Sequence, residues 1–260
     1  MTEHRLPGGR SFGAVRVGDE VRRPAQPWTA TVQTVLRHLE DAGFAGAPRT
    51  LGLDDQGRER LTFLPGETLG DPRPWPAWLR SDEALRQVGG WLRQLHTVTA
   101  AFRPPADAVW FTGRPWQPDL LIGHLDASPW NVVWSGDTLA GFVDWDTASP
   151  CQAEDDLAFS ALTWVPLFPA DLTEEVGFPT PPDRRHRFHL LLDAYGYPAD
   201  RSPIRSAILN RVARNVAVIR ELAATGAPPF QAMLPWAADL ERSGAETAAL
   251  PDDFWQRPGR

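Results

Sequence analysis

Three side chains in the middle of the chain have the types and the spacing that phosphoryl-transfer chemistry needs. Asp126 precedes Asn131 by five residues, and Asp144 follows after two short apolar runs. Phosphoryl-transfer sites use an Asp of this kind to accept the proton of the attacking hydroxyl, and an Asn and a second Asp to hold magnesium. Little covalent chemistry is required of the protein, because positioning and charge neutralisation carry the reaction.

The chemistry of each residue suggests its role. Magnesium prefers oxygen ligands and usually takes one or two protein carboxylates together with phosphate oxygens and water. Asp144 is therefore predicted to be a charged Mg²⁺ ligand, Asn131 a neutral one, and Asp126 the catalytic base. Asp146 is left open between a second ligand and a residue that supports the ligands. The alternative for the whole set is a polar loop with an Asx turn and a helix-capping acid.

A hairpin is predicted to bring these residues together. The apolar runs 132–134 and 139–143 have strand character, and Ser135-Gly-Asp137 lies between them as a turn. An antiparallel return about this turn places residues 131 and 144 side by side. Because Asp126 precedes the first strand by one short loop, the three polar side chains are expected to converge at one end of the hairpin.

The residues before this region predict a small strand-rich part with one helix. Val32, Val35, Leu36 and Leu39 follow the spacing of a helix face, and Gly43 stands just beyond the end of that pattern. Pro65-Gly66 then breaks the strand pattern. The helix is expected over 29–41, and strands are expected over 14–17, 21–23, 50–53 and 60–64.

The remainder of the chain reads as mostly helical. Ser81 with two acids behind it and Ser202 followed by Pro203 are typical helix starts. Helices are expected over 81–96, 154–165, 183–195, 202–224 and 229–243. This order predicts an α+β chain of two lobes, a strand-rich lobe over 1–66 and a helical lobe over 67–260 that carries the hairpin.

Composition excludes several classes of function. The formal net charge of −7 argues against nucleic acid or an anionic membrane as the partner. Cys151 is the single cysteine, so an internal disulfide and a zinc site built on thiolates are excluded. The sequence has no lysine, which removes Schiff-base chemistry and any lysine that binds phosphate. With no signal-like or membrane-spanning apolar run, a cytoplasmic location is expected.

The motifs together resemble the aminoglycoside phosphotransferase family, a small-molecule branch of the protein-kinase-like fold. The resemblance rests on His124-Leu-Asp126 with Asn131, on Asp144-Trp-Asp146, and on Asp156-Leu-Ala158. Val15 to Pro24, Phe63-Leu-Pro-Gly-Glu67 and Leu92 to His96 agree with it. The similarity runs roughly from Leu6 to Leu167, and the helical remainder is compatible with it.

The resemblance implies a two-lobed kinase-like fold, ATP and Mg²⁺ as cofactors, and a small molecule with a hydroxyl group as acceptor. It implies that Phe63, Leu64 and Gly66 lie where the adenine binds, and that Gly8 to Gly13 form a glycine-rich loop over the phosphates. Ser128 stands where protein kinases usually carry a lysine, which favours a small-molecule acceptor. The oligomeric state is not indicated.

Three departures from the family pattern are visible. Arg22 is the best positional match to the missing phosphate-binding lysine, with Arg23 second, and arginine is not interchangeable with lysine. Val32-Gln33 stand where the family usually has the acidic partner of that lysine. Leu125 replaces the usual glycine of the His-Gly-Asp motif.

These observations predict an ATP- and Mg²⁺-dependent phosphotransferase that acts on an aminoglycoside-like compound or on another amino-sugar or amino-alcohol. Two rivals remain. The first is a catalytically impaired relative that binds a nucleotide or a small molecule, favoured by the missing lysine–acid pair. The second is an Asp-rich metal-dependent hydrolase, which would bind a metal tightly without nucleotide.

Overall fold

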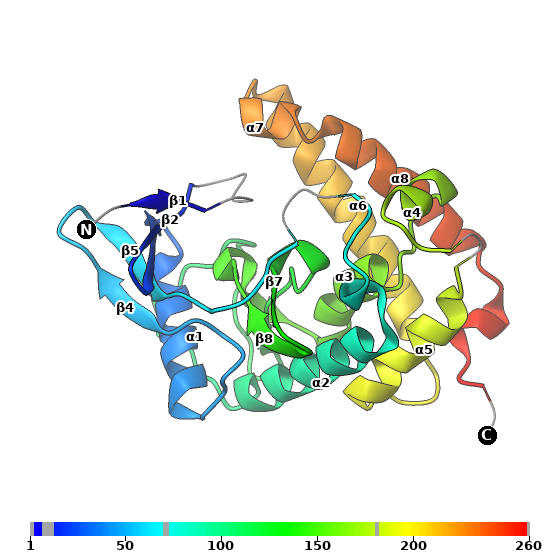
Figure 1. Ribbon diagram of the computed structural model, residues 1–260, viewed down its shortest axis with the longest axis horizontal. Coiled ribbons are helices and arrows are strands. Elements are labelled where there is room, and N and C mark those ends of the chain that lie inside the picture. The colour runs from blue at the N-terminus through cyan, green and yellow to red at the C-terminus, as the bar shows by residue number, and fades with distance from the viewer. Residues whose placement is uncertain (1–2, 7–12, 70–72, 180–181, 259–260) are drawn as a thin grey trace. The chain divides into compact units, whose positions relative to one another are not determined.

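A computed structural model describes residues 3–6, 13–69, 73–179 and 182–258. The chain forms two compact units, the first from 1–71 and 90–156 and the second from 72–89 and 157–260. Figure 1 shows the elements of each unit. These units do not coincide with the predicted lobes over 1–66 and 67–260, because the first unit takes in both 1–71 and the hairpin. The lobe boundary stays a prediction.

An antiparallel sheet forms the N-terminal part of the first unit. Its strand order is β1-β2-β3-β5-β4, and every neighbouring pair is antiparallel. A turn at Gly18, whose φ is +65°, joins β2 to β3. The predicted strands are confirmed with small shifts at their ends, whereas β1 was not predicted. The bounds are β1 His4–Arg5, β2 Val15–Val17, β3 Glu20–Pro24, β4 Thr50–Leu53 and β5 Arg58–Thr62.

Helix α1 covers Thr29–Asp41, as the apolar spacing predicts. Val32, Val35, Leu36 and Leu39 are all buried, so the stripe read from the sequence is the packed face. The chain leaves the helix through Gly43, whose positive φ only glycine adopts without strain. Figure 1 shows α1 beside β4 in this unit.

Two short antiparallel pairs complete the first unit. Strands β7 (Val132–Ser135) and β8 (Thr138–Phe142) form the predicted hairpin, with Val132 opposite Phe142. Strand β6 (Leu121–Gly123) pairs with β9 (Ser149–Cys151). The hairpin therefore begins directly after the segment that carries Asp126 and Asn131.

Backbone contacts tie the hairpin to the segments that precede it. The Phe142 amide donates to the Gly46 carbonyl at 3.1 Å. Glu67 and Trp134 exchange two backbone hydrogen bonds, of 2.7 and 2.8 Å. Gly66 has a φ of +150°, and a Cβ there would lie 2.6 Å from the Trp134 carbonyl oxygen. Glycine is required at this position because the two backbones approach so closely.

The second unit is helical, with part of α2 (Asp82–Thr99) and most of α3 (Ala153–Trp164). The predicted single helix over 229–243 is wrong, because the chain forms two helices there, α7 and α8. Pro235 at the start of α8 has no amide hydrogen to continue a helix from the preceding turn. The other bounds are α4 Ala170–Glu175, α5 Arg184–Tyr195, α6 Ser202–Ala224, α7 Pro228–Gln231 and α8 Leu234–Ala249.

None of the helices in the described ranges combines the length and the apolar character that crossing a membrane requires.

Candidate active site

The loop between β6 and β7 holds Asp126 by both carboxylate oxygens. Oδ1 accepts from the Ser128 hydroxyl at 2.8 Å, and Oδ2 accepts from the Asn131 side-chain amide at 2.8 Å. Ser128 is fully buried, so its hydroxyl is held in place by packing. The structure therefore brings Asp126 and Asn131 together, and their carboxylate and amide groups share one hydrogen bond.

A buried carboxylate on α3 fixes the backbone just before Asp126. Asp156 accepts from the amides of His124 at 2.9 Å and Leu125 at 2.7 Å. It also lies 3.0 Å from His96 Nε2. Burial raises the pKa of Asp156, but the hydrogen bond and the charge of His96 outweigh burial, and the pKa is lowered. An ionised Asp156 thus anchors the loop that carries Asp126.

The His124 ring links this loop to the hairpin. Its Nδ1 accepts from the Asp126 amide at 3.2 Å, and its Nε2 lies 3.1 Å from the Val143 carbonyl oxygen. These partners require a neutral ring that carries its hydrogen on Nε2. Burial lowers the pKa of His124 to about 4, so the ring is neutral at neutral pH.

The backbone is strained at two positions in this region. Leu125 and Asp144 have φ values of +62° and +61°, the left-handed region that side chains other than glycine rarely adopt. Leu125 occupies the usual glycine position of the motif and keeps the left-handed backbone despite its side chain. The hydrogen bond from the Leu125 amide to Asp156 and the burial of the Leu125 side chain hold the backbone in this conformation. Strain of this kind persists where surrounding contacts over-determine the backbone.

Asp144 stands at the end of the hairpin, as predicted. The amide of Val143 donates to the Asn131 carbonyl at 2.9 Å, which places residues 131 and 144 on adjacent segments. The Asp144 side chain is 49% exposed and accepts from Arg23 Nη1 at 3.3 Å. Surrounding protein atoms and the neighbouring Asp146 raise the pKa of Asp144, whereas Arg23 lowers it; the net direction is upward.

Arg23, and not Arg22, is the arginine that reaches this region. Arg22 pairs instead with Glu20 at 3.3 Å and with Asp54 at 3.7 Å. Successive side chains of a strand point to opposite faces, so a choice between neighbouring residues decides the face. The structure thus does not bring Arg22 to Asp144, and the positional match to the missing lysine shifts by one residue.

Two further acids and an indole surround Arg23. Asp146 is 5% exposed and accepts from Arg23 Nη1 at 3.1 Å, Arg23 Nη2 at 2.9 Å and Trp28 Nε1 at 3.0 Å. Glu59 is fully buried and accepts from Arg23 Nε at 2.6 Å. Burial raises the pKa of Glu59, although Arg23 opposes this effect.

Sequence reasoning missed Glu59. The available signal is its place on β5, where Glu59 and Leu61 are the two buried residues of an alternating pattern. A charged residue on the apolar face of a strand needs a buried partner.

The residues predicted to bind adenine follow β5. The Phe63 amide donates to the Asp19 carbonyl at 2.8 Å, and the Arg16 guanidinium lies 3.7 Å from the centre of the Phe63 ring. Phe63 therefore uses its amide within the sheet in this structure. The roles of Phe63, Leu64 and Gly66 stay predictions, and Gly8 to Phe12 of the expected glycine-rich loop lie outside the described residues.

Asn131 and Asp144 each carry a side-chain oxygen of the kind that Mg²⁺ takes as a ligand. The Asn131 nitrogen donates to Asp126, which leaves its side-chain oxygen as the available ligand atom. Within the described ranges, no group of three or more His, Cys, Asp or Glu side chains could hold a metal ion by itself. A two-ligand site is typical of Mg²⁺ bound together with phosphate oxygens and water.

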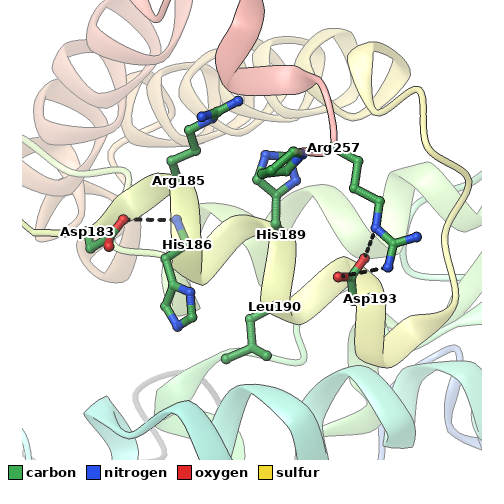
Figure 2. A pocket seen from close by; sticks show the side chains of 8 residues that line it. Asp183, Arg185, His186, His189, Leu190, Asp193 and Arg257 are labelled. Atoms are coloured by element: carbon green, nitrogen blue, oxygen red, sulfur yellow. Dashed lines mark hydrogen bonds and ion pairs between the residues drawn. The ribbon is translucent and has the colours of Figure 1, made fainter. Parts of the chain in front are cut away.

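A separate hollow of about 510 Å³ opens on the second unit, with α5 as one wall (Figure 2). Figure 2 shows Arg257 paired with Asp193, and Asp183 accepting from the His186 amide. None of the predicted site residues lines this hollow, so it is not the predicted catalytic centre.

Several solved structures share this fold. An amicoumacin kinase bound to AMP-PNP, Ca²⁺ and its ligand superposes with a TM-score of 0.64 at 13% identity, over 97% of this chain and 90% of that one. An aminoglycoside 2'-phosphotransferase with GDP gives 0.57 at 15%, over 96% and 93%. A choline/ethanolamine kinase family protein from Mesorhizobium loti gives 0.60 at 16%, over 96% and 93%. The fold is that of the small-molecule phosphotransferases, an α+β protein-kinase-like fold, as predicted.

Comparison of the sequence with curated proteins shows the family of this chain. No family model matches the chain. The trifolitoxin immunity protein of Rhizobium leguminosarum bv. trifolii is 40% identical over 199 residues, which cover 74% of this chain and 73% of that protein. The chain belongs to the family of this immunity protein.

Proposed function

We propose that the protein is an ATP- and Mg²⁺-dependent phosphotransferase that moves the γ-phosphoryl group to a hydroxyl of a small molecule. The observation that carries the proposal is the Asp126 carboxylate, held by Ser128 and Asn131 at 2.8 Å each, beside the hairpin that ends in Asp144. The fold shared with small-molecule kinases supports it.

In this proposal Asp126 orients the acceptor hydroxyl and takes its proton. Both carboxylate oxygens already accept hydrogen bonds, and these bonds fix the direction in which the carboxylate faces the acceptor hydroxyl. Asn131 and Asp144 would hold Mg²⁺, which supplies positive charge against the phosphate oxygens when bound. Asp156 and His124 keep the loop backbone in register with the hairpin.

Arg23 is proposed to bind the phosphates in place of the absent lysine. Its guanidinium already reaches Asp144 at 3.3 Å and carries donors in a fork that suits phosphate oxygens. Phe63, Leu64 and Gly66 are proposed to border the adenine.

The proposed acceptor is an aminoglycoside-like compound or another amino-sugar or amino-alcohol. Two proteins with similar structures have names that point to such acceptors: an amicoumacin kinase and a choline/ethanolamine kinase family protein. The immunity protein of the same family adds a role in protection against a toxin. We propose that this chain inactivates a toxic small molecule by phosphorylating it in the cytoplasm.

The second candidate is a protein that binds a nucleotide or a small molecule without catalysis. It is favoured by the absence of lysine and by Arg23, which is paired with three carboxylates: Glu59, Asp144 and Asp146. A binding protein would protect by sequestering its ligand.

A thermal-denaturation series with Mg²⁺ alone, ATP alone and both together separates these candidates from a metal-dependent hydrolase. A ligand at 100 times its dissociation constant stabilises the folded state by about 2.7 kcal/mol. That raises the midpoint by roughly 5–10 °C in a chain of this size. We expect the largest shift with both ligands, and phosphate transfer in a panel of amino-sugars and amino-alcohols. A large shift with Mg²⁺ alone would favour the hydrolase, and nucleotide binding without transfer would favour the binding protein.

A further inference from the structure

The pairing of Arg23 with Glu59 joins neighbouring strands of the sheet. Arg23 on β3 lies directly opposite Glu59 on β5, and Arg23 Nε donates to Glu59 Oε2 at 2.6 Å. The Glu59 side chain has no exposed surface and that of Arg23 is 11% exposed. A buried charge is retained only where a partner compensates for lost hydration. The pair is therefore a built feature of the sheet interior.

The geometry divides the guanidinium into two functional edges. Nε is taken by Glu59, whereas Nη1 and Nη2 point to the acids of the hairpin end, Asp144 and Asp146. A planar guanidinium fixed at Nε has little freedom to turn, so its two terminal nitrogens keep one direction. That direction is toward Asp144, which is proposed to bind magnesium, and its neighbour Asp146.

The turn of helix α1 where the family usually carries the acidic partner has no acid. Val32 and Gln33 occupy the corresponding turn of α1, and both are buried and uncharged. The carboxylate that accepts from Nε of Arg23 comes instead from the neighbouring strand β5.

We propose that Glu59 is the positioning residue of Arg23. It holds the guanidinium by Nε so that both terminal nitrogens face the nucleotide phosphates, and it replaces an acid of helix α1 with an acid of strand β5. This inference rests on the proposed function, in which Arg23 binds phosphate.

The test compares two ligands of the proposed site. Glu59→Gln keeps the size and the acceptor oxygen but removes the charge. It should weaken binding of MgADP about 10-fold, measured by titration calorimetry, because a mobile guanidinium loses alignment with the phosphates. Binding of adenosine, which has no phosphate, should stay within about twofold of wild type.

Glu20→Gln is the matched control. Glu20 also joins two strands of this sheet, through Arg60 at 2.6 Å, and it does not contact Arg23. This variant should bind both ligands as the wild type does. Glu59→Asp serves as the second variant if Glu59→Gln does not fold, and its shorter carboxylate should produce the same selective loss for MgADP.

The outcomes separate the two proposals. If Glu59→Gln binds MgADP as tightly as the wild type, or loses adenosine and MgADP equally, the positioning role is wrong and the phosphotransferase proposal stands. If wild-type protein binds neither ligand, the proposed function fails and the positioning role fails with it.

Discussion

Two neutral side chains, Ser128 and Asn131, donate to the carboxylate of Asp126. Ser128 and Asn131 each donate to one oxygen at 2.8 Å. These two hydrogen bonds fix the direction of the carboxylate. At the scale of single residues, orientation by Ser128 is therefore a testable part of the account.

Ser128→Ala removes one of the two side-chain donors to Asp126. We expect the turnover number for phosphate transfer to fall by about 10- to 100-fold, since hydrogen bonds to charged groups contribute roughly 1.5–3 kcal/mol. Nucleotide affinity should not change, because Ser128 is not among the residues proposed to touch the nucleotide. Steady-state kinetics with a calorimetric Kd checks this; an equal loss in both quantities would contradict the assignment.

His124 gives the folded state a dependence on pH. The unfolded chain takes up a proton on this ring below about pH 6.5, whereas burial lowers the pKa of the folded ring to about 4. The folded state, which holds the His124 ring neutral, has its full stability above the pKa of the unfolded chain and loses stability as the pH falls toward 4. From pH 7 to pH 5 this ring alone should lower the free energy of unfolding by about 2 kcal/mol.

The measurement is urea denaturation of wild type and His124→Gln across this pH range. The variant should be less stable at pH 7 but should lose less stability on acidification. Parallel curves for the two proteins would show that His124 does not titrate as described. His189, whose pKa is also lowered to about 4, is present in both proteins and cancels in the comparison.

The residues around Arg23 were harder to predict from the sequence than those around Asp126. That Asp126, Asn131 and Asp144 lie near one end of the hairpin could be predicted, because their spacing is fixed within one loop and one hairpin. Arg22 and Arg23 could not be separated, because adjacent strand residues differ only in the face they occupy. Glu59 could not be paired with Arg23 from one sequence, since nothing in it states that β3 and β5 are neighbours.

At the scale of elements, the hairpin β7–β8 positions the site. It could be predicted because its two apolar runs flank a clear turn, and α1 because four apolar residues share one face. The split into α7 and α8 was missed, because apolar spacing continues across the break while Pro235 interrupts the backbone hydrogen bonds. Local signals thus predict elements better than they predict where a helix is interrupted.

Substitution of Gly141 tests how closely this hairpin approaches the backbone at Gly46. Its φ is +151°, and a Cβ would meet the Gly46 carbonyl. Gly141→Ala combines a glycine-only conformation with overpacking, so it should lower the free energy of unfolding by about 3 kcal/mol. Gly136→Ala, in the turn of the same hairpin, has open space around it and should lower it by about 1 kcal/mol. Equal losses in chemical denaturation would contradict the close approach.

At the scale of the whole molecule, the fold and the family support two different parts of the account. Similar structures at 11–16% identity establish a phosphotransferase fold. The relative at 40% identity establishes membership in the family of a toxin immunity protein. A kinase that inactivates a toxic acceptor is consistent with both the fold and the family.

The central claim is that Asp126 is the base of a phosphoryl transfer. The most direct test is Asp126→Asn, measured for phosphate transfer to an accepted amino-sugar or amino-alcohol and for MgADP binding in the same preparation. Asparagine keeps the shape and can still hydrogen-bond Ser128, but it cannot take a proton. We expect turnover to fall by at least about 100-fold with the MgADP Kd unchanged. Turnover equal to that of the wild type would contradict the account.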